Sequence, residues 1–175
     1  MNDPEKIIKR DKCGESFEIR TSCKEDLSCL VDMYHHFSPR PASQGLPPED
    51  PETCRKWVEG IFGLGMNLFA WRGGRIIGHA ALIPDPGGRT GEFVVFVHQH
   101  FRNLGIGSGL TCHILQEAWR IGYNSVWLTV ANNNFIAIKL YNKTGFQFCD
   151  MDACERTMVI ECSKETCRVH ADLKE

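Results

Sequence analysis

A glycine-rich turn occupies Arg102–Gly109, where it joins the apolar run Phe93–Val97 to an amphipathic helical pattern that begins near Gly107. A helix that starts this way presents backbone N–H groups and the positive end of its dipole to an anion. Glycine also lets the main chain approach a ligand closely. The pattern indicates a phosphate-binding turn to which Arg102 adds a charge, although such turns also occur as simple connections.

A second motif follows the strand-like run Val126–Val130. Asparagines at positions 132 to 134 provide a helix start and Gly145 provides a helix stop, so a short helix is expected between them. The predicted order is therefore strand, phosphate turn, helix, strand and helix.

Together the two motifs closely resemble those of the GNAT superfamily of acetyl-coenzyme A-dependent N-acetyltransferases. The first is similar to the family's turn of Arg or Gln, two residues, Gly, one residue, and Gly or Ala. The residues that match the two motifs are Arg102, Gly105 and Gly107, then Asn134, Ala137, Leu140, Tyr141, Gly145 and Phe146. The likeness covers about residues 67–148, so acceptor recognition is expected outside that range.

The alternation of strands and helices favours an α/β (α+β) fold, with a mixed, mostly antiparallel central sheet flanked by helices. The resemblance implies that the central strands splay apart. In the first half, local patterns predict a strand at 17–20, a helix from a Ser22–Glu25 capping box to about Phe37, a proline-rich loop at 38–51 and a helix from Pro51 to about Phe62. A hairpin around Gly73–Gly74 and a strand from Glu92 follow. The second half is expected to contain a helix that buries Leu110, Ile114, Leu115, Ala118 and Ile121, and a closing pair of strands at 146–151 and 157–162.

The resemblance also implies where coenzyme A binds. The end of the strand before the turn would offer backbone groups to the pantetheine arm, much as a peptide adds to a sheet edge. The residues assigned to the coenzyme are Phe96, Val97 and His98 for the arm, Arg102, Asn103, Leu104, Gly105, Ile106, Gly107 and Ser108 for the diphosphate, and Asn134. Asn134 has the alternative of only capping its helix. Acetyl-coenzyme A is the expected cosubstrate, and no metal site is expected.

Acyl transfer to an amine requires a base for the amine, a donor to the oxyanion and an acid for the thiolate. Tyr141 suits the acid, since a phenol keeps its proton at neutral pH, and the resemblance places this hydroxyl near the coenzyme sulfur. Its alternative is packing on the helix face. Glu92 is the candidate base, with a solvated strand-end carboxylate as the alternative. His98 and His100 compete for that role.

The expected activity is transfer of an acetyl group to a primary amine by direct transfer in a ternary complex. A small amine, an amino acid and a protein lysine all remain open as acceptors. The segments Asp32–Pro39 and Gly91–Val95 are similar to the bacterial protein-lysine acetyltransferase branch. The alternative is a non-catalytic acyl-coenzyme A-binding regulatory module. A Rossmann-type site is disfavoured, because Gly105, Gly107 and Gly109 do not form Gly-x-Gly-x-x-Gly.

Composition fits a single core: the chain has 175 residues, 42% of them hydrophobic and 24% charged. The expected organisation is a flexible segment at 1–16, one acetyltransferase domain at 17–162 and a charged tail at 163–175. A net charge of −2 favours neither nucleic acid nor an anionic membrane as partner, and a homodimer is left open. No export signal or membrane-spanning segment is apparent in the sequence, so the protein is expected in the cytoplasm. Its nine cysteines, an odd number, are expected to be reduced thiols there.

Overall fold

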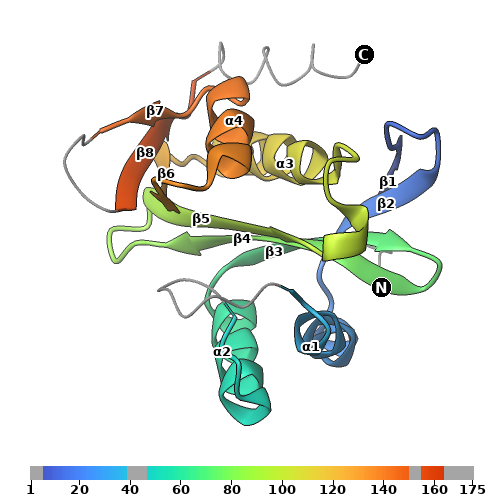
Figure 1. The fold of residues 1–175 in the computed structure, drawn as a ribbon. Helices are drawn as coiled ribbons and strands as arrows, with labels where there is room; N and C mark the ends of the chain where they lie inside the picture. The colour runs from blue at the N-terminus through green and yellow to red at the C-terminus, as the bar shows by residue number, and fades with distance from the viewer. Residues whose placement is uncertain (1–5, 39–46, 150–154, 164–175) are drawn as a thin grey trace. The chain divides into compact units, whose positions relative to one another are not determined.

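The computed structural model describes residues 6–38, 47–149 and 155–163 (Figure 1). The elements, in chain order, are β1 (Lys6–Arg10), β2 (Ser16–Thr21), the 3-10 helix η1 (Lys24–Asp26), α1 (Leu27–His35), α2 (Pro51–Leu64), β3 (Met66–Arg72), β4 (Arg75–Pro84), β5 (Thr90–Val97), the 3-10 helix η2 (Gln99–Phe101), α3 (Ile106–Arg120), β6 (Ser125–Ala131), α4 (Phe135–Lys143), β7 (Gln147–Phe148) and β8 (Glu155–Glu161).

The strands form a sheet with the order β1-β2-β3-β4-β5-β6-β8-β7. The pairs β1–β2, β2–β3, β6–β8 and β7–β8 are antiparallel, whereas β5 and β6 run parallel through a register that places Glu92 opposite Trp127. The mixed, mostly antiparallel sheet with helices that the sequence predicts is therefore confirmed. The splaying of the central strands stays a prediction.

Contacts divide the chain into two compact units, Met1–Ala81 with Val95–Leu110, and Leu82–Val94 with Thr111–Glu175. In the first unit, α1 and α2 pack against each other and lie on the same face of the strands (Figure 1). The fully buried side chains of this unit include Ile19, Leu30, Tyr34, Leu68, Phe69 and Ile77. Asp50 begins α2 by accepting a hydrogen bond from the Thr53 amide at 2.8 Å, which confirms the predicted helix start.

Two expectations for the first unit are wrong. Residues 6–10 of the segment expected to be flexible form β1, because their backbone pairs with β2 from Lys6 opposite Arg20 onward. The expected capping box at Ser22 is displaced by one residue: Cys23 is the N-cap of η1, and its amide donates to the Asp26 carboxylate at 2.8 Å. Arg20 binds that same carboxylate with two hydrogen bonds, which explains why Asp26 takes this position.

A buried polar chain joins α1, β3 and β4 within the first unit. The Asn67 amide nitrogen donates to the carbonyls of Phe62 and Gly65, so its oxygen must accept from His79 Nε2 at 2.8 Å. His79 Nδ1 is then the acceptor for the Tyr34 hydroxyl at 2.7 Å. Burial lowers the pKa of His79 to about 3, so the imidazole is neutral and every member of the chain has a partner.

In the second unit, β6 pairs with β8 over seven residue pairs, from Ser125 opposite Glu161 to Ala131 opposite Glu155. The buried side chains of this unit include Phe93, Ile114, Val126, Leu128, Phe146 and Met158. The predicted helix face is confirmed from Leu110 to Ala118, but Ile121 is 48% exposed, because α3 ends at Arg120 and the chain turns away. The first closing strand is shorter than expected, since β7 is limited to Gln147–Phe148, whereas β8 begins two residues earlier than expected and ends at Glu161. Residues 150–154 and the tail from 164 lie outside the described residues.

Candidate functional site

The predicted phosphate turn lies between η2 and the start of α3. Asn103 and Gly105 have φ values of 62° and 91°, a left-handed conformation that glycine adopts readily and that any other residue at 105 would adopt under strain. The Gly109 amide donates to the Gly105 carbonyl at 3.0 Å, which closes the first turn of α3. The first turn of an α-helix directs its backbone N–H groups outward, so the start of α3 has the general arrangement of a candidate anion site.

Arg102 does not extend freely from this turn. Its Nε donates to the Val97 carbonyl at 3.0 Å and its Nη2 donates to the Ser38 carbonyl at 2.5 Å. The guanidinium carbon also lies 5.0 Å from the centre of the Phe37 ring. The side chain therefore ties the end of β5 to the residues that follow α1, a role that the sequence motif did not indicate.

The Gln99 side chain also connects η2 to the residues that follow α1. Its side-chain amide donates to the His36 carbonyl at 2.7 Å, and its side-chain oxygen accepts from the Ser38 amide at 3.0 Å. Gln99 lies outside both sequence motifs, so local spacing gave no signal of this role.

The three residues expected to bind the pantetheine arm, Phe96, Val97 and His98, make contacts within the protein. Phe96 is 8% exposed and packs edge-on against Tyr34, Phe37 and Trp57. The Val97 carbonyl accepts from Arg102, and the His98 amide donates to the Ile77 carbonyl at 3.0 Å. Burial lowers the pKa of His98, and the nearby charges of His100, Arg102 and His36 lower it further. A neutral His98 is therefore available as a competing base.

Asn134 caps α4, as one of the two sequence interpretations proposed. Its side-chain oxygen accepts a hydrogen bond from the Ala137 amide at 3.2 Å. The side chain is exposed. Its other expected role, binding the coenzyme, stays a prediction.

Tyr141 lies on the inner face of α4 in the second unit. Its ring packs edge-on against Phe93 of β5, with centroids 6.3 Å apart, and against Phe146 at 5.7 Å. The side chain is 7% exposed, and burial raises the pKa of its hydroxyl to about 12. That hydroxyl makes no hydrogen bond with the part of the chain that the structure describes. A protonated phenol without an internal acceptor is suited to donate to a ligand.

Glu92 lies on β5 one residue before the Phe93 that packs on Tyr141. Burial raises the pKa of its half-buried carboxyl, and the negative charge of Asp85 raises it further. Asp85 is held in place, because it accepts from Trp127 Nε1 at 2.9 Å and from the Thr90 hydroxyl at 2.5 Å. Local sequence patterns did not indicate Asp85, because its position near Glu92 depends on the turn between β4 and β5.

Successive side chains of a strand point to opposite faces of the sheet. Because the Phe93 side chain meets Tyr141, the Glu92 side chain points to the other face of β5. The candidate acid and the candidate base therefore belong to one unit but serve opposite faces of the same strand.

Two further histidines, His35 and His36, make local contacts at the end of α1. His35 Nε2 lies 3.3 Å from the Pro51 carbonyl, and His36 Nδ1 lies 2.9 Å from the Asp32 carbonyl. Both side chains are exposed at the end of the helix, where a histidine can complement the helix dipole.

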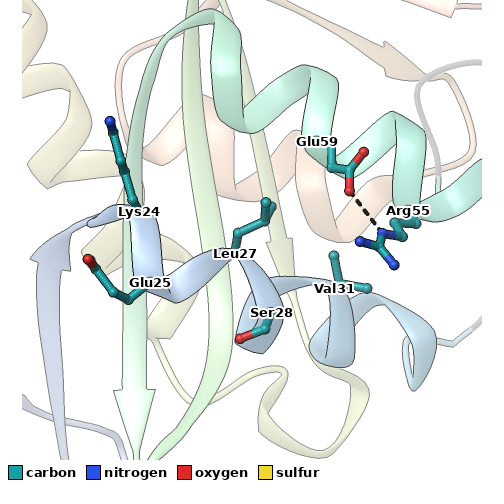
Figure 2. A pocket seen from close by; sticks show the side chains of 7 residues that line it. All are labelled: Lys24, Glu25, Leu27, Ser28, Val31, Arg55 and Glu59. Carbon is teal, nitrogen blue, oxygen red and sulfur yellow. Dashed lines mark hydrogen bonds and ion pairs between the residues drawn. The ribbon is translucent and has the colours of Figure 1, made fainter.

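A cavity of about 420 Å³ lies in the first unit between the start of α1 and α2 (Figure 2). Its lining consists of Lys24, Glu25, Leu27, Ser28, Val31, Arg55 and Glu59. Arg55 and Glu59 form an ion pair at 2.9 Å on its wall, as the dashed line in Figure 2 shows. No residue predicted from the sequence to bind the coenzyme or to act in catalysis lines this cavity.

Cysteines and membrane contact do not add to the site. The seven cysteines in the described ranges are not joined to one another by disulfide bonds, and no group of three or more possible metal ligands gathers within those ranges. No described helix has the length and apolar character needed to cross a bilayer.

Two relatives of known sequence are similar to most of this chain. Phosphinothricin N-acetyltransferase of Streptomyces viridochromogenes is 24% identical over 137 residues, which cover 74% of this chain and 73% of that protein. Mycothiol acetyltransferase of Geodermatophilus obscurus is 27% identical over 152 residues, which cover 82% of this chain. The match covers 48% of the mycothiol enzyme, so this chain spans about half of its length.

Solved structures share the fold. The GNAT domain of S. lividans PAT superimposes with a TM-score of 0.74 at 19% identity, covering 89% of this chain and 96% of that one. The Salmonella typhimurium protein yncA, solved with its cofactor acetyl-CoA, gives a TM-score of 0.68 at 20% identity, covering 86% and 96%. The sequence profile of the acetyltransferase (GNAT) family matches residues 30–146, well over half of the sequence. The chain thus belongs to the acetyltransferase (GNAT) family, whose enzymes use acetyl-coenzyme A.

Proposed function

We propose that this protein transfers an acetyl group from acetyl-coenzyme A to the primary amine of a small amine, an amino acid or a protein lysine, directly within a ternary complex. The observation that carries the proposal is the Tyr141 hydroxyl, which is buried, protonated at neutral pH and without an acceptor among the described residues. A module that only binds the coenzyme would have no use for such a donor.

Glu92 and Tyr141 take complementary parts in the proposed reaction. Glu92, with its pKa raised, accepts a proton from the ammonium group of the acceptor, directly or through water, and so frees the nitrogen lone pair for attack on the thioester carbonyl. The N–C bond forms, the C–S bond breaks and Tyr141 gives its proton to the leaving thiolate. The nitrogen then loses its second proton to water, and the phenolate of Tyr141 takes a proton back from water. In this proposal Glu92 and Tyr141 act from different sides, because the amine approaches the carbonyl carbon from one direction and the thiol departs in another.

The turn 102–108 is the proposed site for the diphosphate of the coenzyme. Its support is the left-handed backbone at Asn103 and Gly105 followed by the start of α3. An amine acceptor is supported by the name of the Streptomyces relative, an N-acetyltransferase. A cytoplasmic location and a homodimer remain expectations from the sequence.

Two measurements test the proposal. Thermal-shift assays with acetyl-coenzyme A and with NAD should show stabilisation by the first alone, by about 2.7 kcal/mol at a hundredfold excess over Kd. Release of free thiol is then followed with a panel of amines, amino acids and lysine peptides. Turnover with any of these acceptors supports the proposal that the protein is an acetyltransferase enzyme. Stabilisation by acetyl-coenzyme A without turnover across the panel would favour the regulatory module instead.

A further inference from the structure

The hairpin formed by β1 and β2 ends in a rigid turn at residues 11–15. The Asp11 carboxylate accepts from the amides of Cys13 and Glu15 at 2.8 and 3.0 Å and from Arg72 at 2.7 Å. The Asp11 side chain is 1% exposed, so this carboxylate holds the turn in one conformation. Local sequence patterns did not reveal this turn, because its anchor, Arg72, is far along the chain.

The same turn contacts the proposed phosphate site. The Lys12 amide donates to the Leu104 carbonyl at 3.1 Å. Lys12 Cγ lies 4.0 Å from the point where a Cβ on Gly105 would stand, and Lys9 Cδ lies 3.5 Å from the equivalent point on Gly109. The aliphatic stems of two lysines therefore pass over the glycines that flank the first turn of α3. Lys12 is exposed and forms no ion pair within the described ranges.

The turn itself contributes one cationic side chain. Arg102 is the only basic residue in the sequence 102–109, and its guanidinium is engaged by the Val97 and Ser38 carbonyls. A diphosphate is doubly charged, and backbone N–H groups supply only partial charges. A lysine whose stem lies against Gly105 can supply further positive charge, because a flexible stem of four carbons lets its ammonium reach the start of the helix.

We propose that Lys12 of the N-terminal hairpin is a coenzyme-binding residue whose ammonium pairs with the diphosphate at the turn 102–108. This inference rests on the proposed function. It adds to the binding site a residue from a hairpin that lies outside both sequence motifs.

The test measures the Kd of coenzyme A by isothermal titration calorimetry in low salt. Lys12→Ala should weaken binding about fivefold and Lys12→Glu about tenfold or more, as expected for an exposed charge near a diphosphate. Lys6→Glu is the matched control, because Lys6 lies on the same hairpin, roughly 20 Å along β1 from the turn. The control should change Kd less than twofold. Melting temperatures without ligand establish that each variant is folded.

Two further measurements test whether Lys12 pairs with the diphosphate or with the 3′-phosphate of the coenzyme. The difference between Lys12→Glu and the unchanged protein should shrink at 1 M salt, where the screening length is about 3 Å. It should persist with dephospho-coenzyme A, which has the diphosphate but lacks the 3′-phosphate. A Kd for Lys12→Glu within twofold of that for Lys6→Glu would overturn the inference, as would an effect that disappears with dephospho-coenzyme A. Failure of the unchanged protein to bind coenzyme A would instead refute the proposed function itself.

Discussion

Tyr141 and Glu92 are both partly withdrawn from water, and the same physical effect suits them to opposite tasks. Burial disfavours the charged form of an acid, so it raises the pKa of both groups. The phenol is therefore protonated at neutral pH, as the proposed donation to the leaving thiolate requires. The carboxyl, whose ordinary pKa is far below neutrality, becomes a better proton acceptor as its pKa rises.

The Tyr141→Phe variant should separate catalysis from packing. The ring contacts with Phe93 and Phe146 remain in the variant, and the lost hydroxyl has no hydrogen bond among the described residues, so stability should change by less than about 1 kcal/mol. Turnover should fall by about a hundredfold, the lower end of what a general acid contributes. Steady-state kinetics and coenzyme titration check this, with Kd for coenzyme A nearly unchanged. Unaltered turnover would remove Tyr141 from the mechanism.

The Asp85→Asn variant should move the pH profile of the enzyme. Glu92 must be ionised to accept a proton, so kcat/KM should rise with pH through the raised pKa of Glu92. Removing the charge of Asp85 lowers that pKa toward its ordinary value, so the acidic limb should shift to lower pH. Asparagine keeps an oxygen that can accept from Trp127. A limb that stays in place would show that another group, such as His98, is the base.

Stability provides an independent readout for Glu92. Its pKa is raised in the folded state, so its favourable contribution is complete below the unfolded pKa and is lost as pH rises through the folded value. Glu92→Gln should consequently raise the melting temperature at pH 7, with a smaller effect below pH 4.5, while it abolishes turnover. A melting temperature that falls at pH 7 would mean that the carboxylate is stabilised by a partner.

At the scale of elements, β4 and α3 approach so closely that one position between them has no room for a side chain. A Cβ on Gly78 would stand 2.9 Å from Leu110 Cδ1, 3.3 Å from Ile106 Cγ2 and 3.4 Å from the Phe96 carbonyl oxygen. Ile106 and Leu110 belong to the first turns of α3, so this contact sets where the helix begins. The position of the phosphate turn thus depends on a glycine of a different element.

Gly78→Ala should therefore disturb binding as well as stability. We expect a loss of about 1–3 kcal/mol in the free energy of unfolding, typical of overpacking, and weaker coenzyme A binding because the start of α3 shifts. Gly60→Ala is the control, since nothing lies within 4 Å of its added Cβ in α2, and it should stabilise by about 0.5–1 kcal/mol. Denaturant unfolding and calorimetric titration measure both effects. Loss of stability with unchanged coenzyme affinity would argue against the link to the phosphate turn.

At the scale of the whole molecule, the two compact units do not divide the chain where domains usually divide. Their boundaries fall after Ala81 within β4, after Val94 within β5 and after Leu110 within α3. Domain boundaries normally fall in exposed linkers that few contacts cross. We therefore keep the prediction of one domain over residues 17–162.

Differential scanning calorimetry checks that prediction. A single domain should unfold in one transition, with the calorimetric enthalpy equal to the van't Hoff enthalpy. Saturating coenzyme A should move that single transition to higher temperature. Two transitions, of which coenzyme A shifts only one, would instead identify the two units as independent folding domains.

The sequence by itself determined the features that depend on neighbouring residues. The glycine turn before α3, the Asn134 cap of α4 and the Asp50–Pro51 start of α2 follow from residue types at short spacings, whereas the proposed role of Tyr141 is implied by the resemblance to a family. Such signals are local, because a cap or a tight turn is made by residues within four positions of one another.

Only the tertiary structure decided which distant groups meet these local motifs. In the folded chain, Arg102 donates to the Ser38 carbonyl and Lys12 lies against Gly105. Asp85 lies near Glu92, and residues 6–10 pair with β2. Each of these contacts depends on the register of a strand or the course of a turn, and hence on how the backbone packs as a whole. No spacing within the sequence encodes them, because the partners are joined by long segments whose path is set by the core.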